Sequence, residues 1–126
     1  MRDFRQLFIW QRAHQLTLAL YRVTAEFPKH EIYGLTSQIR RCAASIGANI
    51  AEGAGKDSHA EMLRFLQMAA GSGSELDNHL LLARDLGFLP LGSYSSLSKE
   101  LTEVRRMMTA FTNEYRERHM FQSSKH

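Results

Sequence analysis

The sequence has little proline, a single cysteine and no long apolar run. With Cys42 alone, neither an intramolecular disulfide nor a zinc site of four cysteines can form, which fits a reducing cytoplasm. The longest apolar runs, such as residues 80–83, are about four residues long, whereas a membrane span needs about 20. The first five residues are followed by no apolar stretch of the kind found in secretory signals. We therefore expect a cytoplasmic protein that does not engage a membrane.

The two prolines, Pro28 and Pro90, both lie between segments with a strong helical pattern. In four segments, apolar residues recur every three or four positions, as on one face of an α-helix. No segment alternates apolar and polar residues over a useful length, so strands are not expected. The predicted buried faces are Ile9, Ala13, Leu16, Leu20, Val23 and Phe27; Leu35, Ile39, Cys42, Ile46 and Ile50; Met62, Phe65, Ala69, Ser72, Leu76, Leu80 and Ala83; and Leu97, Leu101, Val104, Met108, Phe111 and Tyr115.

Short connections between the four segments predict that consecutive helices are antiparallel neighbours. The sequence thus predicts an all-α fold, an antiparallel up-down-up-down four-helix bundle over residues 1–118, with a disordered tail at 119–126. The third helix is expected to begin with a capping box at Ser58 and Glu61 and to end near Gly87. Residues 71–74, Gly-Ser-Gly-Ser, could form a linker. Because the apolar pattern keeps its phase across them, we predict a continuous helix packed closely on the small residues 43–48.

Two of the predicted helices carry more apolar surface than one small bundle can bury. A helix that is apolar around most of its circumference is buried on more than one side. The sequence therefore predicts contacts between subunits, and hence a homo-oligomer. The residues outside the main apolar faces are Leu7, Trp10, Thr17 and Tyr21 in the first helix, and Leu63, Leu66, Met68, Leu81 and Leu82 in the third.

The motifs of enzymes and metal proteins are absent from the sequence. It contains no Glu-x-x-His pair and no His-Glu-x-x-His motif, and no strand precedes the glycine-rich turn at 53–58. Glu75 and His79 lie one helical turn apart and could together ligate a metal, but a hydrogen bond is the favoured interpretation. Cys42 is expected to be buried and unreactive. We predict a non-enzymatic protein with no metal and no cofactor.

Three polar residues are candidates for a structural network: Asn49, Glu52 and Glu75. A carboxylate near the C-terminus of a helix, as at Glu52, is unfavourable for the helix dipole and calls for a compensating charge. Arg5 or Arg12 of the preceding helix is the expected partner.

Arginine dominates the basic residues, since 12 of the 16 Lys and Arg residues are Arg and the net charge is +3. Arg5, Arg12, Arg40 and Arg41 have no acidic residue three or four positions away. They are the candidate nucleic-acid-binding residues, forming a patch for phosphate. The alternative is that they pair with Glu52 or Glu75. No aromatic residues are interleaved with them for base stacking, so sequence-specific recognition of a single strand is not expected.

The chain contains four longer motifs: Leu7-x-x-Trp10-x-x-Ala13, Phe27-Pro28-x-x-Glu31-x-x-Gly34-Leu35-Thr36-x-Gln38-Ile39-Arg40-Arg41, Ser45-Ile46-x-x-Asn49-Ile50-Ala51-Glu52-Gly53 and Phe65-Leu66-x-x-Ala69-x-Gly71-Ser72-x-x-Glu75-Leu76. Together they resemble the 23S rRNA intervening-sequence protein family, also called the S23 ribosomal-protein family. Gly47 and Cys42 depart from the family pattern, because they stand where the family usually has proline and alanine.

The resemblance implies a bacterial cytoplasmic protein whose four-helix bundles assemble into a pentameric ring. Some members of the family are encoded within rRNA genes, and others assist retroelements by binding nucleic acid and a reverse transcriptase. We therefore expect a non-enzymatic scaffold or accessory protein that binds RNA or DNA through basic surfaces. The alternative is a protein–protein adaptor, for example for a reverse transcriptase, with no nucleic-acid binding of its own.

Overall fold

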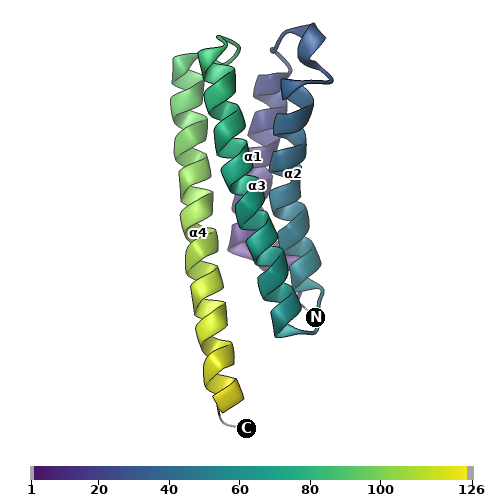
Figure 1. The fold of residues 1–126 in the computed structure, drawn as a ribbon, viewed down its shortest axis with the longest axis vertical. Helices are drawn as coiled ribbons and strands as arrows, with labels where there is room; N and C mark the ends of the chain where they lie inside the picture. Colours follow the sequence, from purple (N-terminus) through teal and green to yellow (C-terminus); the bar gives the residue numbers. More distant parts are fainter. Residues whose placement is uncertain (1, 125–126) are drawn as a thin grey trace.

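The computed structural model describes residues 2–124, with side chains described as far as Arg118. All regular structure within this range is helical, as predicted, and it includes no strand. Four α-helices lie side by side as a bundle (Figure 1). The elements are the 3-10 turn η1 (Phe4–Gln6), α1 (Phe8–Thr24), the 3-10 turn η2 (Lys29–Glu31), α2 (Leu35–Ala54), α3 (His59–Asp85) and α4 (Leu91–Ser124).

Each α-helix packs against two others. α1 contacts α2 and α4, and α3 also contacts α2 and α4. The α1–α2 and α3–α4 connections lie at one end of the bundle, and the α2–α3 connection lies at the other end (Figure 1). Within the described residues, no helix is both long and apolar enough to cross a membrane.

The core consists largely of the residues in the predicted apolar faces. All the predicted α2 residues are buried, and most of those in the other helices are too. Val23, Phe65, Ser72 and Phe111 are half-buried. Leu66 was expected to face another subunit, but it is 1% exposed and belongs to the core of this chain. The periodic pattern therefore located the core correctly and overstated the surplus apolar surface of α3.

The ends of α3 follow the predicted chemistry. Ser58 precedes the helix in an extended conformation, and its hydroxyl oxygen accepts a hydrogen bond from the Glu61 backbone N–H. At the other end, Gly87 has a φ of +80°, a conformation that glycine adopts without steric cost. The N–H of Phe88 then donates to the Ala83 carbonyl. Both helix ends thus satisfy backbone groups that the helix itself leaves without partners.

α3 is continuous through residues 71–74, as predicted, but the packing of its glycines differs from the prediction. Contact with residues 43–48 of α2 is made by Ser72, whose hydroxyl lies 2.9 Å from that of Ser45. Gly73 instead faces α4, where a Cβ would lie 3.4 Å from Arg105 Cγ. Gly71 has no neighbour within 4 Å of the position of a Cβ. The missing side chains therefore do not bring α3 closer to α2 at this point.

α2 approaches α3 closely at Gly53. A Cβ at this position would lie 2.9 Å from Met62 Sδ and 3.0 Å from Phe65 Cβ. These distances are shorter than van der Waals contact, so the two helices can meet here only because residue 53 has no side chain.

Trp10, the single tryptophan of the chain, packs between α1 and α2. A Cβ at Gly47 of α2 would lie 3.4 Å from its indole Nε1. On α1 the indole stacks on His14, with 4.7 Å between ring centroids, and it meets the edge of Phe4. Trp10 is half-buried and contacts groups from α1, α2 and η1.

α4 is the longest helix and projects beyond the other helices at its C-terminal end (Figure 1). A disordered tail was predicted for residues 119–126. The backbone is helical through Ser124, and residues 125–126 lie outside the described part of the chain.

Candidate functional site

The four candidate arginines do not gather into one patch within a single chain. Arg12 on α1 pairs with Glu100 on α4, with 2.9 Å between Nη2 and Oε1. Arg40 on α2 is directed toward α1, where its Nε donates to Thr24 Oγ1 at 2.9 Å and its Nη2 donates to the Tyr21 carbonyl at 3.2 Å. These two side chains therefore link helices.

Arg5 and Arg41 are the exposed members of the set. Arg5, within η1, pairs at 3.1 Å with Asp3, the residue that precedes this turn. Arg41 has no hydrogen bond or ion pair with the residues that the structure describes. The expected pairing of Arg5 or Arg12 with Glu52 is wrong, because Glu52 pairs with Lys56 on its own helix at 3.8 Å. These partners depend on how each helix is rotated about its own axis. The spacing of residues along one helix does not show this rotation.

Aromatic rings of the chain itself lie beneath several arginines. The guanidinium carbon of Arg5 lies 4.8 Å from the centre of the Phe4 ring, and that of Arg40 lies 4.7 Å from the Tyr21 ring. Arg2 lies 4.8 Å from the Tyr115 ring. Of these three contacts, only the one between Phe4 and Arg5 could be anticipated from the sequence, because the two residues are adjacent. The other two pairs join different helices or segments.

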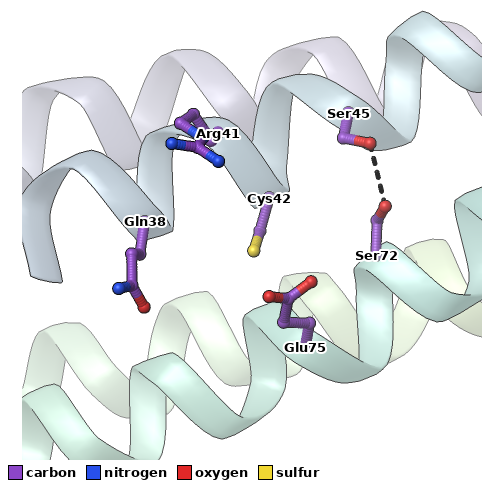
Figure 2. Close-up of a pocket in the computed structure, with 6 residues that line it drawn as sticks. All are labelled: Gln38, Arg41, Cys42, Ser45, Ser72 and Glu75. Carbon is purple, nitrogen blue, oxygen red and sulfur yellow. Dashed lines mark hydrogen bonds between the residues drawn. The ribbon is translucent and has the colours of Figure 1, made fainter.

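Of the three residues predicted to form a polar network, Asn49 takes part in hydrogen bonds that lead into the groove between α2 and α3. The Asn49 amide donates to the carbonyl and the hydroxyl oxygen of Ser45, at 2.9 and 3.0 Å. Ser45 in turn shares a hydrogen bond with Ser72 of α3 (Figure 2). Glu75 lies one turn further along α3 in the same groove, whereas Glu52 lies apart with Lys56. Sequence reasoning missed the two serines, which connect the helices.

A cavity of about 400 Å³ opens in this groove. Its lining is polar apart from Cys42, and the Cys42 thiol and the Glu75 carboxylate point toward one another (Figure 2). The Gln38 amide extends toward α3 beside them. The lining residues are Gln38, Arg41, Cys42 and Ser45 of α2, and Ser72 and Glu75 of α3.

The pKa of the Cys42 thiol is raised from 9.0 to about 11, with burial as the largest cause. The negative charge of Glu75 and a hydrogen bond to its carboxylate also contribute to this rise, and the positive charge of Arg41 opposes it. The thiol is therefore protonated at neutral pH and a weak nucleophile, as the sequence led us to expect. The contribution of Glu75 comes from the neighbouring helix and could not be anticipated.

His79 follows Glu75 by one turn and is largely enclosed, with 12% of its side chain exposed. The expected hydrogen bond between them is not formed, because Nε2 lies 3.7 Å from Glu75 Oε1. Both ring nitrogens are buried and have no hydrogen-bond partner among the described residues. Cys42, Glu75 and His79 converge so that one donor atom of each lies within 4.8 Å of the others.

The sequence pattern and the helical architecture agree with one protein family. The model of the family described as 23S rRNA-intervening sequence protein matches residues 5–110. The chain belongs to this family. The match extends over nearly the whole described chain and confirms the resemblance that the sequence motifs indicated.

A solved structure shares the fold of this 23S rRNA-intervening sequence protein. It is a protein of unknown function from the S23 ribosomal protein family of Bacteroides thetaiotaomicron VPI-5482. The TM-score is 0.74 at 20% sequence identity, over 82% of this chain and 97% of the other. No curated protein matches this chain.

Proposed function

We propose that this protein is a non-enzymatic, oligomeric scaffold or accessory protein that binds nucleic acid, RNA in the first place, through contacts to phosphate. Membership of a family named for intervening sequences of 23S rRNA supports an association with RNA. The net charge of +3 and the excess of arginine over lysine support contacts to phosphate.

The observation that carries the proposal is the state of Arg41. It is exposed and has no acidic partner within ion-pair distance among the described residues, whereas its neighbour Arg40 is held by α1. Glu75 lines the same cavity, but its carboxylate points at Cys42, and the Arg41 guanidinium lies along α2 (Figure 2). Arg41 is therefore available to a phosphate without breaking a contact within the chain.

In the proposed assembly, consecutive helices are antiparallel and five bundles form a ring in the cytoplasm. Five chains at +3 each give the ring a charge of +15, which attracts RNA over a longer range than one chain can. Exposed apolar side chains on α1 and α3 supply contact surface, among them Phe8 at 61% and Met68 and Leu82 at 45% exposure.

A protein–protein adaptor is the second candidate function, and the apolar end of the bundle favours it. Tyr33 is 95% exposed in the α1–α2 connection, and Leu91 is 72% exposed where α4 begins. Both belong to the end of the bundle that holds the α1–α2 and α3–α4 connections (Figure 1). A partner such as a reverse transcriptase could bind this end without any contact to nucleic acid.

A salt titration of binding to a labelled single-stranded RNA of mixed sequence tests the proposal. We expect the affinity to fall with salt, with a log–log slope of about −0.7 for each phosphate neutralised. Arg41→Gln should flatten the slope, whereas Arg64→Gln, a change of an exposed arginine on α3 that already pairs with Glu61 at 3.1 Å, serves as the matched control. Absence of RNA and DNA binding at low salt would overturn the proposal and favour the adaptor.

A further inference from the structure

We infer that Cys42, Glu75 and His79 form a binding site for a divalent transition-metal ion of the zinc class between α2 and α3. The site offers one sulfur, one carboxylate oxygen and one imidazole nitrogen, all within 4.8 Å of one another. Glu75 and His79 are spaced i, i+4 and share one face of α3, while Cys42 approaches from α2.

The buried imidazole of His79 is the observation that points to a ligand. A neutral imidazole has one donor and one acceptor nitrogen, and a buried polar group without a partner is unfavourable. Both His79 nitrogens are buried and without a hydrogen-bond partner in the described structure. The carboxylate of Glu75, at 3.7 Å, is too far for a hydrogen bond but close enough to share a metal ion. Coordination would satisfy one of the two nitrogens.

The chemistry of the donors selects the metal. Thiolate and imidazole together favour zinc and related transition ions over magnesium or calcium, which prefer oxygen. Binding breaks the Cys42 S–H bond, the proton leaves to solvent, and a sulfur–metal bond forms. The thiolate and the carboxylate then neutralise a divalent ion, and Arg41 is the remaining charged group that lines the cavity.

The cavity supplies an entry path and a further coordination position. Three protein ligands leave one position of a tetrahedral ion open, which is the arrangement of zinc sites that bind water or an exogenous ligand. The cavity of about 400 Å³ lies beside Cys42 and Glu75, and the Gln38 amide extends into the same region. Because the ligands come from two helices, the bound ion would also fasten α2 to α3.

The site can be tested by adding Co²⁺, and then Zn²⁺, to chelator-treated full-length protein kept under a thiol-free reductant. We expect one Co²⁺ per chain with a thiolate-to-cobalt charge-transfer band, displaced by Zn²⁺. Cys42→Ser and His79→Gln should each remove the band and weaken binding by more than the roughly 10–100-fold that loss of an outer-shell partner costs. His30→Gln, at an exposed histidine on η2, should leave binding unchanged.

Glu75→Gln keeps the experiment decisive if the buried variants fail to fold, because the Glu75 side chain is 63% exposed. It should weaken Co²⁺ binding at least about tenfold while the circular dichroism spectrum stays the same. The inference is overturned if the protein gives no charge-transfer band, or if Cys42→Ser or Glu75→Gln binds Co²⁺ as tightly as the unaltered protein does. Metal binding that survives all three substitutions would belong to histidines elsewhere. RNA binding is measured separately, so the two proposals can fail independently.

Discussion

Arg40 of α2 donates a hydrogen bond to the hydroxyl oxygen of Thr24 on α1, and that hydroxyl donates in turn to the Leu20 carbonyl. Thr24 is 2% exposed, so this chain of hydrogen bonds crosses the α1–α2 interface inside the molecule. Arg41, the next residue, points elsewhere and is exposed. Two adjacent arginines that look equivalent in the sequence therefore have different roles.

Arg40→Gln should destabilise the fold, and Arg41→Gln should not. The first substitution removes charge-assisted hydrogen bonds to Thr24 and Tyr21, which predicts a loss of about 1–3 kcal/mol in the free energy of unfolding. The second changes an exposed side chain and should stay within about 0.5 kcal/mol. Urea unfolding followed by circular dichroism measures both. Equal effects of the two substitutions would contradict the separate roles.

Gly53→Ala should destabilise the protein by about 1–3 kcal/mol, because the new methyl group would lie 3.0 Å from Phe65 Cβ and 2.9 Å from Met62 Sδ. Gly71→Ala is the matched control, since it also replaces a helical glycine but nothing lies within 4 Å. It should stabilise α3 by about 0.5–1 kcal/mol. Thermal unfolding of both variants gives the comparison, and the prediction fails if the two melting temperatures shift in the same direction.

Alkylation of Cys42 should be slow at neutral pH and should accelerate as the pH approaches about 11, because the thiolate is the reactive form. Glu75→Gln removes a negative charge that raises the pKa of the thiol, so it should speed the reaction at a given pH. Arg41→Gln removes the opposing positive charge and should slow it. Rates of reaction with iodoacetamide on the folded protein measure these effects. A rate that levels off near the ordinary pKa of 9.0 would contradict the assigned environment.

The helices and most of the core were predictable because burial repeats every three or four residues along a single helix. Because the apolar pattern keeps its phase across Gly71 and Gly73, it correctly predicted that α3 continues through them despite their low helix propensity. Leu66 was misplaced because it lies off the main apolar stripe, yet the neighbouring helices bury it. Periodicity within one helix shows which face is apolar, but it does not show how far the neighbours extend around it.

The site residues were less predictable because they depend on the register between helices. Ser45 of α2 meets Ser72 of α3. One turn away along the same pair of helices, Cys42 of α2 meets Glu75 of α3. Had this register been known, the two contacts would have followed together. Sequence spacing linked Glu75 to His79 within α3, but it gave no sign that Cys42 would join them or that Glu100 would pair with Arg12.

Trp10, half-buried between α1 and α2, gives the protein an intrinsic optical reporter. Since the chain has one tryptophan, all of its indole fluorescence comes from the point where α1 meets Gly47 of α2, beside His14 and Phe4. A change in its emission therefore signals a change at this one junction, whereas circular dichroism averages over all four helices. Comparing the two signals during unfolding would show whether α1 separates from α2 before the rest of the bundle loses its helical structure.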